Sequence, residues 1–289
     1  MSTRLLASVK IQGMPELPEV ETIRRQLAPA LEGRRLEALE VLDPRWCEPA
    51  EPVALEDAVR GRRIERVSRR GKYLVLELAG DVHLAMHLRM TGTLLLVHED
   101  ERPHLRARMV LEGGKRLLFV DVRRFGTGVV LLGSDARDAY FDARLGVEPL
   151  DPDFTAEALR ALASGRRAPV KAFLLNQERI AGVGNIYADE ALFRAGIHPL
   201  RQTRRLNPAQ WEALRRGVVE SIRAGIAADG ASIDDYRDPD GVRGRFQDEF
   251  LVHRRAGQPC PGCGATIVKL VAAGRGTYAC ERCQPRPRR

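Results

Sequence analysis

Four cysteines near the C-terminus restrict the fold of this chain more than any other feature. Cys260 and Cys263 form one Cys-x-x-Cys pair, and Cys280 and Cys283 form a second pair after sixteen intervening residues. Two such pairs supply four thiolates in tetrahedral geometry, the ligand set of structural Zn²⁺ sites, with two disulfides as the alternative. The spacing predicts a zinc ribbon over residues 250–284. Because four protein ligands leave no open position, the single Zn²⁺ is expected to be structural.

The composition restricts the compartment and the partner of this chain. Hydrophobic residues make up 44% of its 289 residues, which excludes a disordered protein and allows two domains and a small appendage. The apolar run at residues 5–9 is too short for the core of a secretory signal, and no stretch resembles a membrane span. We therefore expect no membrane contact and a reducing, cytoplasmic location. The net charge of +8 favours a polyanionic partner, most simply nucleic acid.

The first half of the chain has a strand pattern behind an N-terminal helix. The helix is indicated by Val20, Ile23, Leu27 and Leu31 at helical spacing, and it ends before Gly33. Short apolar segments with turn signals between them follow, at Tyr73–Leu78, Leu94–Val97, Met109–Leu111, Leu117–Val122 and Val129–Leu132. The pattern predicts an antiparallel β-sandwich or flattened barrel, and a first domain over residues 14–146.

After a linker at residues 147–153, the apolar residues recur at helical spacing. Helices are expected over residues 154–164, 170–177 and 185–194, and a longer one begins at Pro208 with Asn207 as its cap. They predict a helical domain over residues 154–230, followed by a polar loop over residues 231–249. After the ribbon, residues 285–289 form a basic tail. The fold class is thus an α+β multidomain protein.

Residues 14–21, with the sequence MPELPEVE, offer an unusual nucleophile. If Met14 initiates translation and is removed, Pro15 carries a terminal secondary amine, with a pKa of about 8 against about 10.4 for a lysine. Glu16 is then placed to shuttle protons. The alternative is a proline-capped surface helix with solvated glutamates. The amine requires residues 1–13 to be a non-native extension, because with them attached Pro15 is an ordinary tertiary amide.

Two further segments suit contact with nucleic acid. Residues 182–190, GVGNIYADE, place two glycines before a helix N-terminus, which can bring backbone N–H groups close to a phosphate. Residues 69–73 place Lys72 and two arginines around Gly71, although a solvated sheet edge is the alternative. Taken alone, Lys171 fits a solvated lysine at a helix start and Met90 fits core packing.

The order of these motifs resembles the formamidopyrimidine-DNA glycosylase family, bacterial repair enzymes for oxidised purines in duplex DNA. The resemblance runs from residue 14 to residue 283 and rests on MPELPEVETIRRQL, RRGKY, HLRMTG, DVRRFG, GVGNIYADE and the cysteine pairs. It implies a monomeric enzyme of the bacterial nucleoid with DNA bound between two lobes. The implied activity is that of a bifunctional glycosylase and AP lyase, which forms a Schiff base on Pro15 and cuts the strand by β,δ-elimination.

The resemblance also implies roles for individual residues. Pro15 is the nucleophile, Glu16 the proton shuttle and Glu19 a supporting carboxylate, while Lys72 contacts the phosphate beside the lesion. The residues implied to bind DNA are His104, Arg123, Lys171, Asn185 and Arg275, and those implied to fill the space of a flipped base are Met90, Arg123 and Phe125. The loop from Ser232 to Phe246 is expected to contact the extruded base.

Two alternatives remain open from the sequence. An enzyme of the endonuclease VIII type, from the same superfamily, would prefer oxidised pyrimidines, although MPELPEVE with Met90, Arg123 and Phe125 favours the purine enzyme. A zinc-ribbon DNA-binding protein without catalysis would suit a chain in which Pro15 is not exposed.

Overall fold

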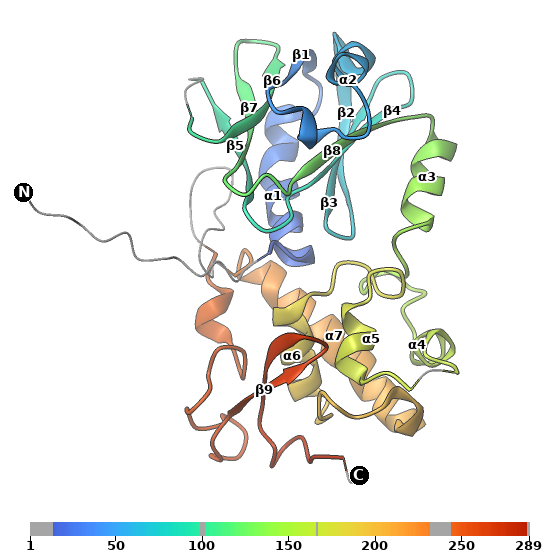
Figure 1. Ribbon diagram of the computed structural model, residues 1–289, viewed down its shortest axis with the longest axis vertical. Helices are drawn as coiled ribbons and strands as arrows, with labels where there is room; N and C mark the ends of the chain where they lie inside the picture. The colour runs from blue at the N-terminus through green and yellow to red at the C-terminus, as the bar shows by residue number, and fades with distance from the viewer. Residues whose placement is uncertain (1–13, 99–101, 166, 232–243, 288–289) are drawn as a thin grey trace, which may run out of the picture.

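The computed structural model describes residues 14–98, 102–165, 167–231 and 244–287. These residues form two lobes, with the β-sandwich in one and a group of helices with the ribbon in the other (Figure 1). The predicted extension at residues 1–13, most of the loop at residues 231–249 and the last two residues of the basic tail lie outside the described residues.

Helix α1, Leu17–Leu31, belongs to both lobes. Its first turn contains Pro18, and its buried face carries Val20, Ile23 and Leu27, as the helical spacing predicted. These side chains pack into the core of the sandwich, whereas Leu17 packs into the core of the helical lobe. The residues that precede α1 therefore lie where the two lobes meet.

The strands of the first lobe form an antiparallel eight-stranded sheet in the order β5-β7-β6-β1-β2-β3-β4-β8. Between β1 and β2 only two residue pairs are in register, Arg35 with Arg63 and Leu36 with Arg62. The two halves of the sheet share one apolar core, so the predicted β-sandwich is confirmed. The strands are β1 Arg35–Val41, β2 Arg62–Arg70, β3 Tyr73–Leu78, β4 Val82–His87, β5 Gly92–Val97, β6 Leu105–Leu111, β7 Arg116–Asp121 and β8 Thr127–Leu132.

Two helices of this lobe were not predicted from the sequence. Helix α2, Pro52–Val59, follows a short 3₁₀ turn at Pro44–Trp46, and α3, Ser134–Asp142, follows β8. In α3 only Phe141 is buried, where it contacts the ring of Tyr73. A helix that buries so few side chains has little hydrophobic periodicity, and for this reason the pattern missed it.

The second lobe contains the four predicted helices with small changes in their bounds: α4 Ala156–Leu162, α5 Val170–Leu175, α6 Asn185–Arg194 and α7 Pro208–Ala227. Asn207 caps α7 by accepting a hydrogen bond from the backbone N–H of Gln210 at 2.8 Å. Short 3₁₀ turns lie at Thr203–Arg205 and Phe246–Glu249. No helix among the described residues is long and apolar enough to cross a membrane.

The ribbon consists of strands β9, Val268–Ala272, and β10, Arg275–Ala279, joined by a turn at Gly274. Gly274 has a φ of +67°, in the left-handed region that favours glycine. The hairpin lies beside α6 in the second lobe (Figure 1). This arrangement places Arg275 at the exposed end of the hairpin.

Candidate active site

The Glu16 side chain crosses from the N-terminal segment to the start of α6. Its carboxylate accepts hydrogen bonds from the backbone N–H groups of Ile186 at 3.0 Å and Tyr187 at 3.5 Å. These donors belong to the first turn of the helix, whose positive end favours a negative charge. The glycine segment before α6 was expected to bring such N–H groups close to a phosphate. In the structure, two of them bind Glu16 instead.

Glycines at 182 and 184 leave the space that Glu16 needs. A Cβ at position 184 would overlap the Glu16 carboxyl group, and one at position 182 would lie 2.7 Å from the Cβ of Leu17. The carbonyl oxygen of Gly182 also accepts a hydrogen bond from the N–H of Leu17 at 3.0 Å. The glycine segment thus holds residues 15–17 directly against the second lobe.

Burial gives Glu16 an unusual acidity. The residue is only 3% exposed, and this desolvation raises the pKa of its carboxyl to about 7. The positive charge of Lys72 opposes the rise, whereas the negative charge of Glu19 adds to it. A carboxyl group with a pKa near 7 can both accept and donate a proton at neutral pH.

Glu19 connects the N-terminal segment, helix α6 and the start of the loop at Ala231. Its carboxylate accepts hydrogen bonds from the N–H of Glu16 at 2.8 Å, the hydroxyl of Tyr187 at 2.7 Å and the N–H of Ala231 at 2.8 Å. Burial is the main cause that raises the pKa of this carboxyl as well. Ala231 begins the predicted lesion-contacting loop, so Glu19 joins the base of that loop to the N-terminal segment.

Lys72 occupies the turn between β2 and β3 and is 5% exposed. Desolvation lowers the pKa of its ammonium group, against the attraction of Glu16 and Glu19. The adjacent Gly71, with a φ of +56°, donates its N–H to the carboxylate of Glu148 in the linker. Glu148 also pairs with Arg69 at 2.9 Å and Arg70 at 3.2 Å. The linker therefore fixes the turn that carries Lys72.

Lys171 lies deeper than the sequence indicated. Its side chain is 0% exposed, and its Nζ donates to Asp189 Oδ1 at 2.6 Å and to Thr277 Oγ1 at 2.7 Å. Asp189 also binds the ring nitrogen Nδ1 of His253 at 2.8 Å. The ammonium group therefore joins α5, α6 and β10, and its implied contact with DNA stays a prediction.

Asn185 and Arg275 meet at one side of the ribbon hairpin. The Asn185 side-chain amide donates to the carbonyl oxygen of Gly276 at 3.0 Å, next to the exposed Arg275. His104 is also exposed and has a left-handed φ of +65° before β6. All three side chains lie at the surface or near it, and their contacts with DNA remain predictions.

The three residues predicted to fill the space of a flipped base lie on two loops. Met90 follows β4 and is half-buried, and Phe125 lies in the loop between β7 and β8 with 49% of its surface exposed. The guanidinium of Arg123 lies 4.7 Å from the centre of the Phe125 ring. Phe125 is thus an exposed aromatic side chain in contact with a cation, and the insertion of these residues into DNA remains a prediction.

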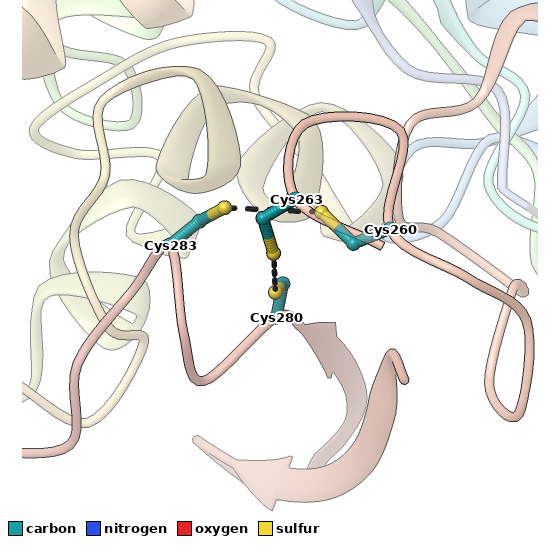
Figure 2. Close-up of side chains that lie close together, drawn as sticks. All are labelled: Cys260, Cys263, Cys280 and Cys283. Carbon is teal, nitrogen blue, oxygen red and sulfur yellow. Dashed lines mark hydrogen bonds between the residues drawn. The ribbon is translucent and has the colours of Figure 1, made fainter. Parts of the chain in front are cut away.

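The four cysteines form a cluster whose geometry fits one metal ion. Figure 2 shows their sulfur atoms directed toward one another from two loops. All four lie within 4.8 Å of one another, with Cys260 Sγ 3.8 Å from Cys283 Sγ and Cys263 Sγ 3.5 Å from Cys280 Sγ. A Zn–S bond of about 2.3 Å in a tetrahedron requires sulfur atoms about 3.8 Å apart, whereas a disulfide requires about 2.05 Å. The cluster therefore fits one structural zinc, as predicted, and the disulfide alternative is wrong.

Several buried carboxylates that hold segments of the site together were not singled out from the sequence. Asp189 and Glu190 are fully buried, and Glu190 accepts hydrogen bonds from the backbone of the segment that leads into the ribbon, including His253 N–H at 2.9 Å. All residues of α6 from Ile186 to Leu192 are buried, so the acidic residues among them must find partners. Glu148 and Asp121 are two further carboxylates that were not singled out from the sequence.

Comparisons with known proteins agree with this fold and site. Residues 14–128 match the formamidopyrimidine-DNA glycosylase N-terminal domain, residues 145–237 the H2TH domain of that enzyme, and residues 257–286 the zinc finger found in FPG and IleRS. A formamidopyrimidine-DNA glycosylase from Chloroflexus aurantiacus is 46% identical over 94% of this chain and 98% of its own length.

Solved structures give the same result. The MutM (Fpg) protein from Thermus thermophilus is 42% identical, with a TM-score of 0.85 over 95% of this chain and all of that chain. Lactococcus lactis Fpg, 34% identical over 94% of this chain and all of its own, was solved with DNA that contains an abasic site (TM-score 0.87) or an oxidised pyrimidine (TM-score 0.86).

The fold and the site define a two-lobed protein of the DNA glycosylase class, with an H2TH domain and a zinc finger. This chain belongs to the formamidopyrimidine-DNA glycosylase family.

Proposed function

We propose that this DNA glycosylase of base excision repair excises oxidised purines from duplex DNA and then cuts the strand as an AP lyase, with Pro15 as its nucleophile. The observation that carries the proposal is the environment of Glu16. A buried carboxyl group with a pKa of about 7 lies directly after Pro15, and the charge of the buried Lys72 acts on it. Such a group is suited to move protons to and from an adjacent amine.

The proposed reaction begins with a neutral Pro15 amine. Its nitrogen attacks C1′ of the damaged nucleotide while the bond from C1′ to the base breaks, and the departing base takes a proton from water. The ring opens to an iminium that links Pro15 to the sugar. Loss of a proton from C2′ expels the 3′ phosphate, and a later loss from C4′ expels the 5′ phosphate.

Glu16 and Lys72 support separate parts of this sequence. The ionised Glu16 carboxylate accepts the proton that Pro15 loses on attack, and returns it to the sugar oxygen as the ring opens. The Lys72 ammonium, held in place by Glu148 through Gly71, binds the phosphate beside the lesion. Glu19 accepts hydrogen bonds from the backbone N–H groups of Glu16 and Ala231, and so holds Glu16 and the start of the loop in fixed positions.

The remaining proposed contacts bind and open the duplex. His104, Asn185 and Arg275 hold the DNA backbone on the two sides of the site, and Lys171 supports the hairpin that carries Arg275. Met90, Arg123 and Phe125 fill the space left by the flipped base. The zinc maintains the ribbon and takes no part in the chemistry.

Pro15 can act only as a free amine, so the position of the N-terminus tests the proposal. The family match begins at residue 14, which supports a working chain that starts at Pro15. The experiment is borohydride trapping on duplex DNA with one 8-oxoguanine opposite cytosine. It compares the full chain, a chain that begins at Pro15, and a control with one glycine added before Pro15.

We expect a covalent adduct only from the chain that begins at Pro15. The control has a terminal amine within one residue of Pro15, so its failure to form an adduct would exclude a general effect of a shortened N-terminus. Absence of an adduct in all three forms would disprove the nucleophile and favour a DNA-binding protein without catalysis.

A preference for oxidised pyrimidines is the second candidate, because the Lactococcus lactis Fpg was solved with DNA that contains an oxidised pyrimidine. Single-turnover rates on 8-oxoguanine and on an oxidised pyrimidine, in otherwise identical duplexes, separate the two. We expect the purine lesion to be removed faster.

A further inference from the structure

Asp121, the last residue of β7, is a buried carboxylate that the proposed reaction does not use. Its side chain is 0% exposed. Its Oδ1 accepts hydrogen bonds from the hydroxyl of Thr91 and from the N–H of Arg123 at 3.1 Å. Its Oδ2 accepts from the N–H groups of Phe125 at 2.8 Å and Gly126 at 2.7 Å. An ionised carboxylate offers about four acceptor sites, and here each of them has a donor.

These donors come from the two loops that carry Met90, Arg123 and Phe125, which together form the predicted wedge that fills the space of a flipped base. Thr91 directly follows Met90, and its hydroxyl oxygen also accepts a hydrogen bond from the N–H of Arg123 at 3.2 Å. Asp121 thus links the Met90 loop to the loop that contains Arg123 and Phe125. No other described residue accepts hydrogen bonds from both loops.

The backbone of Asp121 extends the connection to a third segment. Its N–H donates to the carbonyl oxygen of His104 at 3.0 Å, and its own carbonyl oxygen accepts from Arg106 Nε at 2.8 Å. The predicted DNA contact His104 is therefore fixed to the same residue as the wedge. One position holds three surface segments that are separate in the sequence.

The wedge loop needs this support because its backbone is strained. Arg124, between the two wedge residues of this loop, has a left-handed φ of +59°. At position 126 a side chain would collide with the ring of Phe119 and crowd Asp121 Oδ2 at 3.2 Å, so the loop also has no room to move inward. Without the carboxylate, the N–H groups of Phe125 and Gly126 would lose their acceptor, and that of Arg123 would keep only the hydroxyl of Thr91.

We propose that Asp121 is a positioning residue that makes Met90, Arg123 and Phe125 insert into DNA as one unit. The inference rests on the proposed function, because only an enzyme that flips a base needs a wedge. Asp121 itself touches neither the DNA nor the reacting atoms. It acts by keeping two loops at a fixed separation while the duplex is forced open.

Asp121→Asn is the most informative variant, because it preserves the size of the side chain. In either orientation of the new amide, its NH₂ group replaces a carboxylate oxygen that accepts a hydrogen bond from a backbone N–H in the wild type. At least one backbone N–H therefore loses that acceptor. Thr91→Val removes only the hydroxyl that joins the two loops. Glu56→Gln is the matched control: Glu56 lies in the same lobe and accepts a backbone hydrogen bond from Val41 at 2.9 Å, but it has no link to the wedge.

The variants are compared in the form of the chain that traps. Three readouts are used: single-turnover excision of 8-oxoguanine from a duplex, fluorescence of 2-aminopurine next to the lesion, and borohydride trapping on a single strand with an abasic site. We expect Asp121→Asn to slow duplex excision and the fluorescence change roughly ten- to a hundredfold. Trapping on the single strand, which needs no wedge, stays at the wild-type rate. Thr91→Val gives the same pattern with a smaller loss, and Glu56→Gln changes neither substrate.

The result that overturns the inference is an equal loss on both substrates, which indicates a merely structural role, or no loss on either. If Asp121→Asn fails to fold, Thr91→Val is used in its place, and an equal loss on both substrates or no loss on either overturns the inference. A wild-type chain that never traps overturns the proposed function as well, so the two failures are distinguishable.

Discussion

Lys72 and Lys171 are two of only five lysines in a chain with 47 basic residues, and both lie in the interior. Desolvation lowers the pKa of both ammonium groups. Their partners differ. Lys171 forms hydrogen bonds to Asp189 at 2.6 Å and to Thr277 at 2.7 Å, whereas Lys72 faces Glu16 and Glu19 through longer-range charge interactions.

This difference suits Lys171 to a structural role and Lys72 to the proposed chemical one. The charge of Lys171 is neutralised by a carboxylate in direct contact, and its removal would leave Asp189 buried without a cation. Lys72 is held by its backbone, because Gly71 and two arginines bind Glu148 while the ammonium keeps its donors for a ligand. We therefore propose that the same residue type at similar burial serves stability in one lobe and reactivity in the other.

The largest expected effect tests the structural side of this comparison. Lys171→Met should lower the free energy of unfolding by about 3–5 kcal/mol, because it leaves the buried Asp189 carboxylate without the cation that neutralises it. Urea unfolding measures the loss, and adding Asp189→Asn to the same chain should restore part of it. Lys115→Met, the same change at a less buried lysine in a turn, is the control and should cost less than about 0.5 kcal/mol. If Lys171→Met is as mild as the control, the comparison fails.

The sequence predicted the helices and strands better than it predicted the contacts between distant side chains. The bounds of β3 and α6 were predicted to the residue, and the cap of α7 was predicted as well, because capping and periodicity are local properties of the sequence. Helix α3 was missed because it buries a single side chain.

The residues that organise the site were harder to predict than the residues that form it. Asp189 binds a lysine that precedes it by eighteen residues and a histidine that follows it by sixty-four, and no local pattern indicates such partners. No local pattern indicates the partners of Asp121 and Glu148 either, because each of these carboxylates binds segments that are distant in the sequence. Motif spacing identified the metal ligands, since two tight pairs of cysteines carry their geometry within a few residues.

The next effect tests the chemical side of the comparison. Lys72→Met should slow single-turnover excision by about a hundredfold, because a positioned cation beside the developing charge is lost. Its free energy of unfolding should stay within about 1 kcal/mol of wild type, since no buried carboxylate loses a direct partner. Urea unfolding of the same preparation measures stability, with Lys115→Met as the control for both assays. A stability loss as large as that of Lys171→Met would show that Lys72 is also structural.

The smallest effect concerns the carboxyl group that Lys72 faces. The folded-state pKa of Glu16 is about 7, above its ordinary value of 4.5, so folding favours the protonated form. The stability that this group contributes is complete below pH 4.5 and is lost as the pH rises through about 7. Between pH 5.5 and pH 8, wild-type protein should therefore lose about 1–2 kcal/mol more than Glu16→Gln, which cannot ionise.

Urea unfolding of both proteins at the two pH values measures this difference, with the exposed Glu220→Gln on α7 as a control that should follow wild type. Glu16→Gln should also slow trapping at every pH and abolish its rise between pH 6 and pH 8, because that rise reports the carboxylate that accepts the proton from Pro15. Parallel stability curves for wild type and Glu16→Gln would mean that Lys72 already holds Glu16 ionised near its ordinary pKa. In that case Lys72 is paired much as Lys171 is, and the contrast between the two lysines disappears.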